Sequence, residues 1–406
     1  MPRVSVVVPV YQVAEYLDDA LGSIAAQTLR DFEVVIVDDG STDGSADIAH
    51  AWTERDRRFR IVGRPNGGLG RARNHGVAAG DSELVAFVDG DDMLMPDALR
   101  LLCGSLDRTG SDFATGNVLR FDGAGQRPAP FLRKAFMRER RRTHVTRFPW
   151  LVSDRVAWNK VWRRSFLDRH ALRFAEDVYH EDIPMVLPAH FLATAVDVVA
   201  APVYRYRVRE GETLSITQRR TEITVLRDRA RAITGVCDFL DAEELPCSAY
   251  HESVLAEDLR YHLDVLPDGD AAYRRTFLRV AQRFLERVGP RAEERLPAIQ
   301  RLKWHLVRRG LLEEAIEVVR FERDEFRSSP KVLVGGRAHG AYPFRSDATL
   351  AVPQSVYRLD TSRRRARHAM TLMRPASVPR RRIAPVRVPE PAVVLPARAG
   401  SHALRT

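Results

Sequence analysis

The sequence has few cysteines and no long apolar run. Only three of its 406 residues are cysteine, and they have neither the paired spacing of a disulfide framework nor that of a metal site. The first apolar run is interrupted by Ser5 and Pro9, unlike a signal peptide, and no stretch approaches the roughly 20 apolar residues that cross a bilayer. These absences predict a cytoplasmic protein, in solution or at the inner face of the cell membrane.

Acidic residues are nearly absent from the end of the sequence. Residues 361–406 contain eleven arginines and one acid, Glu390, so this tail supplies the whole net charge of +10. Residues 1–360 are formally neutral, which removes the main support for nucleic-acid binding. The tail is rich in Arg, Pro and Ala and has no amphipathic period, so we predict that it is disordered.

The pattern of apolar residues predicts an α/β fold. Apolar residues make up 45% of the sequence, which is enough for a sizeable core. In the first hundred residues, runs typical of buried strands alternate with amphipathic helices. The expected order is strand 4–9, helix 16–26, strand 32–37, helix 45–53, strand 59–62, helix 69–79 and strand 84–88. Such an order indicates a Rossmann-like, mostly parallel sheet with helices on both faces.

The later sequence predicts further parts. We expect an α/β domain over 1–220 and a helical domain over 221–328, where the pattern is amphipathic and broken by prolines. Residues 329–360 are predicted to be a linker or the start of a further module, followed by the disordered tail over 361–406.

Paired acids follow the second predicted strand. Asp38 and Asp39 come directly after it, and a Gly-Ser turn then leads into a helix. Because ligands of parallel sheets bind at the carboxyl ends of the strands, we predict that Asp39 accepts hydrogen bonds from a nucleobase or ribose. Asp43 is better explained as a cap of the next helix.

Three carboxylates follow the fourth predicted strand, at Asp89, Asp91 and Asp92. Closely spaced carboxylates repel one another unless a cation neutralises them, and their hard oxygens suit Mg²⁺ or Mn²⁺. Gly90 lets the backbone approach a ligand closely. The alternative is an acidic surface turn, but the position after a buried parallel strand favours a metal site.

A glycine-rich turn with two arginines begins the third predicted helix, in the run Asn66–Gly76. Backbone N–H groups and a guanidinium there suit nucleotide phosphates or a base edge. The lysine of an ATPase loop is missing. The alternative is a tight structural turn with Asn74 packed inside the fold. Of the two arginines, Arg73 is the stronger candidate for ligand contact.

Several motifs thus occur in a defined order along residues 3–220. They are Val8–Tyr11, Gln27, Asp38–Asp43, Asn66–Gly76, Asp89–Asp92, Trp158–Trp162, Glu181–Pro184 and Ser215–Thr217. Each is weak alone, but as an ordered set they resemble the family 2 glycosyltransferases with the GT-A fold. The arrangement of such a domain, a helical segment and then residues 331–360 also resembles actinobacterial enzymes that make teichoic-acid-like wall polymers.

The resemblance implies an inverting, metal-dependent transfer of a sugar from a nucleotide-sugar donor, a UDP-sugar, to an acceptor hydroxyl. The acceptor would be a glycopolymer or a lipid-linked molecule of the cell wall or surface. Asp91 would bind Mg²⁺ or Mn²⁺, and Arg209 is an equal contender with Arg207 at the diphosphate. The residues implied in donor binding are Pro9, Tyr11, Asp39, Asn66, Arg73, Asp89, Gly90, Lys160, Arg207 and Ser215.

The pair Glu181-Asp182 precedes a predicted buried helix over 183–195 and matches the Glu-Asp motif of the family. By this match, Asp182 would take the proton from the acceptor hydroxyl as the catalytic base. The alternative is an acid pair favoured by the helix dipole. His180, directly before the pair, is expected at the surface.

Other interpretations stay open at this point. The basic segment Lys134–Arg147 is either a site for an anionic polymer or lipid phosphate, which would allow peripheral membrane association, or a solvated loop. A nucleotidyltransferase is the nearest enzymatic rival and would release pyrophosphate. A catalytically silent scaffold of a polymer-synthesis complex is the rival from another class.

Overall fold

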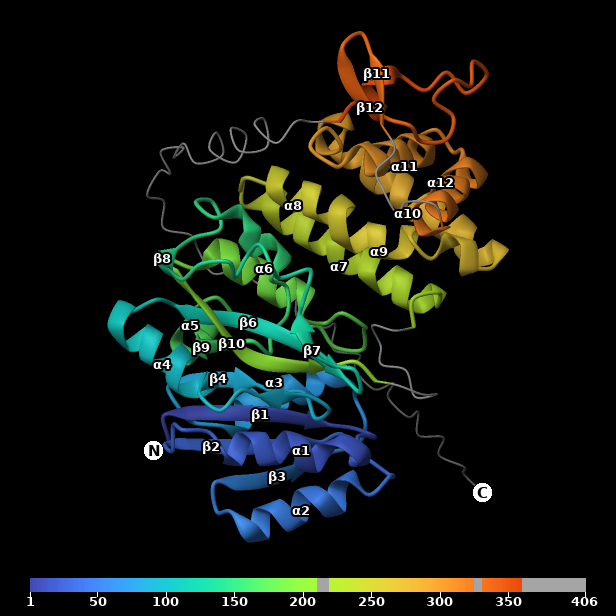
Figure 1. Cartoon of the computed structure of the whole chain (residues 1–406). Helices are drawn as coiled ribbons and strands as arrows, with labels where there is room; N and C mark the ends of the chain where they lie inside the picture. The colour runs from blue at the N-terminus through green and yellow to red at the C-terminus, as the bar shows by residue number, and fades with distance from the viewer. Residues whose placement is uncertain (210–218, 325–330, 360–406) are drawn as a thin grey trace, which may run out of the picture.

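A computed structural model describes residues 1–209, 219–324 and 331–359 (Figure 1). The tail over 361–406, predicted to be disordered, and the predicted donor contact Ser215 both lie outside these described residues.

The first part of the chain alternates strands and helices, as its sequence predicts. The elements are β1 (Val4–Val10), α1 (Ala14–Ala25), β2 (Phe32–Asp38), α2 (Ser45–Arg55), β3 (Phe59–Gly63), α3 (Leu69–Ala79) and β4 (Leu84–Phe87). Every residue of β1 and β4 is buried, because helices cover both faces of the sheet at these strands. The predicted α/β fold class is therefore confirmed.

The chain then extends the sheet. The further elements are β5 (Met93–Leu94), α4 (Ala98–Thr109), β6 (Phe113–Asp122), β7 (Gly125–Pro128), β8 (Arg140–Thr143), η1 (Pro149–Ser153), β9 (Lys160–Arg163), α5 (Arg164–Arg169), α6 (Ile183–Leu192) and β10 (Val196–Arg207). The strand order is β3-β2-β1-β4-β9-β6-β10-β5, with β7 on β6 and β8 on β10. The first four strands are parallel, β9 runs antiparallel to both its neighbours, and β10 is parallel to β6.

A bulge interrupts β10 at Pro202. The register of β10 against β6 shifts on both sides of Pro202, between Val199 and Tyr204. Proline has no N–H to donate to the ladder, so the strand bulges there instead of ending. One strand of twelve residues results, and its far end reaches the acid-rich turn after β4.

The carboxyl ends of three parallel strands meet at one edge of the sheet. Because β1 lies between β2 and β4, the chain segments that leave these strands at Tyr11, Asp39 and Asp89 are neighbours. Helix α3 packs tightly beneath them. A Cβ atom added to Gly76 would lie 2.2 Å from Cγ1 of Val7, so only glycine allows this approach.

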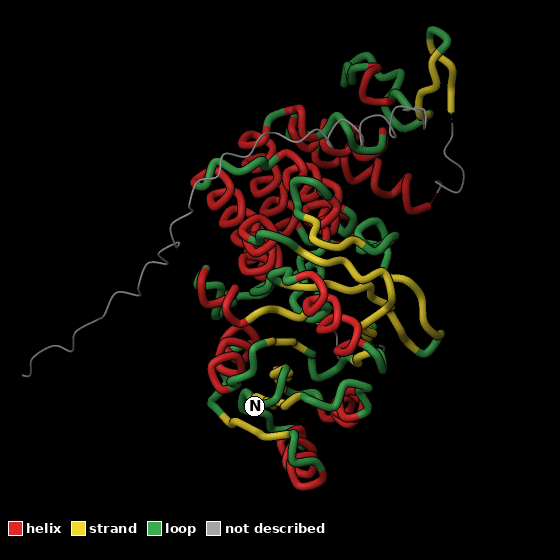
Figure 2. Tube along the Cα trace, turned by 90° about the vertical axis from the view of Figure 1, so that its left-hand side faces the viewer, coloured by secondary structure: helices red, strands yellow, loops and turns green. Residues whose placement is uncertain are grey.

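Helices make up most of the chain after the sheet. They are α7 (Ile223–Ala242), α8 (Ser248–Ser253), α9 (Leu259–Leu263), α10 (Ala271–Val288), α11 (Ala298–Arg308) and α12 (Leu312–Asp324), with η3 (Val254–Asp258), η4 (Leu266–Asp268) and η5 (Pro290–Ala292) between them. Helix α7 packs against α6, which joins the helices to the sheet. Figure 2 shows the helices gathered beyond the sheet.

A small hairpin follows the helices. It pairs β11 (Lys331–Val334) with β12 (Arg337–Gly340), and the short α13 (Gln354–Tyr357) packs against α11. No helix among the described residues is both long and apolar enough to cross a membrane.

Candidate active site

The guanidinium of Arg73 is the centre of the predicted site. It lies on α3, is 1% exposed, and donates hydrogen bonds to Asp89 (2.6 Å) and to Glu181. It also lies over the ring of Phe174 at 5.3 Å. Burial acts to lower the pKa of Arg73, but Asp89, Glu181 and Asp182 raise it above its ordinary value. The donors of Arg73 point at protein carboxylates, so Arg73 positions the acids, and the predicted donor contact is not supported.

Helix α3 also fixes the chain segment that carries the predicted base. A Cβ atom on Gly70 would lie 1.9 Å from the carbonyl oxygen of Ala175, so this segment rests directly on the helix backbone. Asn74 exchanges two hydrogen bonds with the backbone of Phe174, at 2.9 and 3.0 Å. The glycine-rich run therefore has a structural role at these positions, which the sequence left open as an alternative.

Asp182 stands at the N-cap of α6 but makes no side-chain hydrogen bond to that helix. Its carboxyl group is partly buried, and burial raises its pKa. Arg73 and Arg229 lower the pKa, whereas the charge of Asp89 raises it further. Its neighbour Glu181 accepts a hydrogen bond from Arg73, which also donates to Asp89, so the chain segment that carries the predicted base is tied to the turn after β4.

The residues beside Asp182 are buried. Burial raises the pKa of Glu181 to about 7, against the effect of Arg73. The expectation of a surface position for His180 is wrong, because this side chain is 8% exposed and burial lowers its pKa well below the ordinary value. His180 adopts a positive φ of 61°, which turns the chain sharply into the Glu181-Asp182 pair.

The first and third acids after β4 are tied to the sheet. Asp92 is buried and accepts hydrogen bonds from the hydroxyl of Tyr204 (2.9 Å) and the backbone N–H of Arg207 (2.7 Å). The same hydroxyl accepts a hydrogen bond from the backbone N–H of Asp89 (3.1 Å). Burial and the neighbouring acids raise the pKa of Asp92 well above its ordinary value. Asp92 and Tyr204 therefore hold the turn in place.

Asp91 has a different environment, which fits a cation. Arg209 donates two hydrogen bonds to Oδ2 of Asp91, at 2.7 and 2.9 Å. Burial raises the pKa of Asp91, Arg209 opposes this, and Asp89 adds to it, so negative charge is poorly compensated here. Carboxylate oxygens are suitable ligands for Mg²⁺ or Mn²⁺. No group of three metal-ligating side chains exists among the described residues, so a metal here would take its other ligands from elsewhere.

Two arginines at the end of β10 approach this turn. Arg207 donates to the backbone carbonyl of Asp91 (2.8 Å) and to Asp19 (3.1 Å), while Arg209 binds the Asp91 carboxylate. Both guanidinium groups lie over the ring of Tyr16, at 5.0 and 5.2 Å. Arg209 therefore contacts the carboxylate of Asp91, which is predicted to bind the metal, and Arg207 holds the backbone of Asp91 in place.

The predicted nucleoside contacts lie at the carboxyl ends of β1 and β2. Asp39 is 3% exposed and accepts hydrogen bonds from the backbone N–H groups of Gly67 (3.1 Å) and Gly68 (2.8 Å). In this structure it shapes the glycine-rich turn. Tyr11 is 51% exposed, and Asn66 is also exposed. Their contact with a nucleoside stays a prediction.

Pro9 and Gly90 make up the floor between these strands. Both are buried, and a Cβ atom on Gly90 would lie 3.0 Å from Cγ2 of Val13 and 3.3 Å from the carbonyl oxygen of Pro9. The backbone is therefore closely packed here against protein atoms. Direct contact of either residue with the donor stays a prediction.

Lys160 does not lie where the sequence predicts. Its ammonium group is buried, 2.8 Å from the carboxylate of Asp154, and donates to Val156 (2.6 Å) and Asn159 (2.9 Å). Burial lowers its pKa. Its strand, β9, is inserted between β4 and β6 in the interior of the sheet, so the side chain enters the core. The predicted contact of Lys160 with the diphosphate is wrong in this structure.

Sequence reasoning missed one residue of the site, Tyr204. It joins Asp89 and Asp92 across more than a hundred residues and stacks on Trp158, with ring centroids 4.3 Å apart. No local motif marks it, because its partners come together only through the pairing of β10 with β5 and β6.

Comparisons with known proteins agree with this geometry. Residues 5–170 match the family model described as "Glycosyl transferase family 2". The chain is 33% identical over 228 residues to the putative glycosyltransferase EpsH of Bacillus subtilis, covering 54% of this chain and 63% of that protein. It is 28% identical over 273 residues to the poly(ribitol-phosphate) beta-N-acetylglucosaminyltransferase TarS of Staphylococcus aureus, covering 64% and 44%. The matched region thus spans less than two thirds of each relative.

A solved structure shares the fold. The crystal structure of S. aureus TarS 1–349 in complex with UDP-GlcNAc superposes with a TM-score of 0.65 at 21% identity, covering 84% of this chain and 97% of that one. At this identity the likeness concerns the fold alone. Residues 5–170 thus match glycosyl transferase family 2 in sequence, and the fold is like that of the S. aureus structure.

Proposed function

We propose that the protein is an inverting glycosyltransferase that moves a sugar from a UDP-sugar to an acceptor hydroxyl in the synthesis of a cell-wall or surface glycopolymer. One observation carries the proposal most strongly. Arg73 bridges Glu181, directly before Asp182, and Asp89, in the turn that bears Asp91. A sugar-diphosphate held at Asp91 would thus face a base at Asp182.

Asp182 has the properties of a general base in this arrangement. It lacks a hydrogen bond to its own helix, and its pKa is raised by burial, so it binds a proton more readily than an exposed aspartate. As the acceptor oxygen bonds to the anomeric carbon, its proton passes to Asp182. The bond from that carbon to the diphosphate breaks on the opposite face, and the configuration inverts.

Asp91 and the arginines of β10 would serve the leaving diphosphate. A Mg²⁺ or Mn²⁺ ion held by Asp91 would neutralise the charge that builds up on this group. Arg209 now occupies one oxygen of Asp91 and could turn to a phosphate oxygen when the donor binds. Arg73 and Glu181 would keep Asp89 and the base in position without touching the donor.

The comparisons support the choice of donor and acceptor. The solved TarS structure is described in complex with UDP-GlcNAc. The TarS sequence is named as a poly(ribitol-phosphate) beta-N-acetylglucosaminyltransferase. We therefore propose a UDP-hexose or UDP-N-acetylhexosamine as donor and a glycopolymer or a lipid-linked precursor as acceptor.

The test is to incubate the protein with Mn²⁺ and a panel of nucleotide sugars, and to identify the nucleotide product. Release of UDP that requires an acceptor supports the proposal, whereas release of pyrophosphate would indicate a nucleotidyltransferase. Asp182→Asn should abolish transfer and keep donor binding, while Asp91→Ala should weaken metal-dependent donor binding. Loss of donor affinity in the Asp182 variant alone would reverse the two roles.

A further inference from the structure

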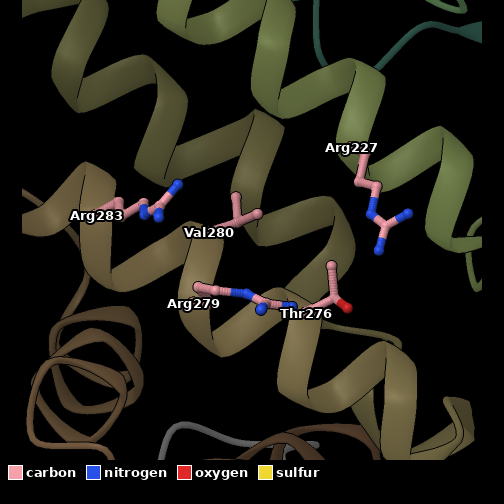
Figure 3. A pocket seen from close by; sticks show the side chains of 5 residues that line it. All are labelled: Arg227, Thr276, Arg279, Val280 and Arg283. Carbon is pink, nitrogen blue, oxygen red and sulfur yellow. The ribbon is translucent and has the colours of Figure 1, made fainter.

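A basic groove lies between two helices, away from the acids after β4. Arg227 on α7 faces Arg279 and Arg283 on α10 across a cavity of about 300 Å³, with Thr276 and Val280 at its base (Figure 3). This volume is at the lower end of the range for ligand sites. On α10 the lining residues follow the spacing i, i+3, i+4, i+7, so they form one continuous stripe.

The three arginines of this groove have no partners in the described part of the chain. None of them makes an ion pair or a hydrogen bond there, and all three side chains are exposed to solvent. The arginines at the ends of the same helix differ. Arg274 donates to two backbone carbonyls, and Arg287 binds two aspartates of α7. Acids are therefore available on these helices but are not used in the groove.

Repulsion among these unpaired positive charges destabilises the protein when no ligand is bound. Arg279 and Arg283 are four residues apart, a spacing at which like charges destabilise a helix. Arg227 adds a third positive charge from the facing helix. An anionic ligand would remove this repulsion, and guanidinium groups suit phosphate because they can donate two parallel hydrogen bonds.

We propose that this groove binds a linear polyanion with repeated phosphodiester groups. Arginines spread over a helical turn and a facing helix suit successive phosphates better than a single one. The lining contains no aromatic side chain on which a base could stack, which argues against single-stranded nucleic acid. A polymer of this kind could be the acceptor of the proposed transferase, and this link alone rests on the proposed function.

A lipid surface is a poorer match. Helices that lie on membranes present large apolar side chains beside their basic residues. Among the described residues, the exposed large apolar side chains are Met1, Tyr11, Phe131, Met137, Trp150 and Leu333, and none lies on α7 or α10. The groove is thus basic without an apolar border.

Binding of a fluorescent linear glycerol-phosphate oligomer to the full chain, measured by anisotropy without sugar donor, tests the proposal. We expect Arg279→Gln with Arg283→Gln to weaken binding by about tenfold or more, since hydrogen bonds to charged groups are lost. The matched control is Arg57→Gln with Arg108→Gln, which removes two exposed charges elsewhere and should change affinity by no more than about twofold. Replacement of both groove arginines by lysine keeps the charge and should give an intermediate affinity.

Several results would overturn the proposal. Equal losses in the two glutamine pairs would show that only net charge matters. Competition by inorganic phosphate as strong, per phosphate, as by the oligomer would indicate a single-phosphate site. Arginine-dependent binding of phosphatidylglycerol vesicles without oligomer binding would indicate a lipid surface, and equal affinity for single-stranded RNA would indicate nucleic acid. Because no sugar donor is present, a negative result leaves the proposed transfer reaction untouched.

Discussion

Glu181 makes the stability of this protein depend on pH in a direction that can be worked out. Burial raises its pKa from the ordinary value of 4.5 to about 7. Between these values the folded protein binds the proton more tightly than the unfolded chain does. The free energy of unfolding therefore falls as the pH rises from 4.5 towards 7. A pKa difference of this size changes the free energy of unfolding by about 3 kcal/mol across the window.

The substitution Glu181→Gln isolates this effect. Glutamine keeps an oxygen that can accept from Arg73 but does not titrate. Urea unfolding of both proteins at several pH values between 4.5 and 7.5 gives the difference in unfolding free energy, in which groups that do not interact with Glu181 cancel. We expect this difference to shift in favour of the variant by about 3 kcal/mol across the window.

A neighbouring glutamate provides a control of opposite sign. The hydrogen bond from Arg71 lowers the pKa of Glu176, so Glu176 contributes stability above its ordinary pKa that is lost as the pH falls. Glu176→Gln should therefore be relatively less stable at neutral than at acid pH. If the Glu181→Gln difference does not change with pH, then Arg73 keeps Glu181 ionised throughout and the reasoning from burial is wrong.

Three further predictions concern the site and its support. Because burial raises the pKa of Asp182, the transfer rate at saturating donor should fall with decreasing pH, starting above the ordinary aspartate range; a flat acid limb in a pH–rate profile would contradict this. Gly70→Ala should lower the free energy of unfolding by about 1–3 kcal/mol in urea titrations and slow transfer, since the methyl group collides with Ala175, whereas Gly235→Ala meets no atom within 4 Å. Lys160→Met should cost about 3–5 kcal/mol because it leaves Asp154 buried without its cation, and an unchanged urea midpoint would refute the buried pair.

The sequence predicts the fold well where one local pattern decides the structure. The runs of β1, β2 and β4 are mostly apolar and become largely buried strands. Helix α3 has the predicted bounds, because its glycine-rich start and Gly80 at its end punctuate the pattern clearly. The grouping of Asp39 and Asp89 at one edge follows from parallel pairing alone.

Individual side chains of the site depend on contacts that no local pattern records. Lys160 enters the core because β9 is inserted between β4 and β6, which its own four residues do not reveal. His180 is buried in a segment that is bonded to α7 through Tyr179 and Asp228, and Arg73 turns to Glu181 because the segment after α5 returns to α3. These side-chain positions depend on packing between segments that are distant in the sequence, and such contacts cannot be predicted from local patterns in one sequence.

The bulge at Pro202 has a consequence for the acid cluster. Side chains of a strand alternate between its faces, so the bulge determines which face each later side chain of β10 occupies. With one residue fewer at that point, the hydroxyl of Tyr204 would leave Asp92, and Arg207 and Arg209 would both turn away from Tyr16 to the opposite face. The shape of the turn after β4 thus depends on the number of residues at the bulge, in a strand that lies a hundred residues later in the chain.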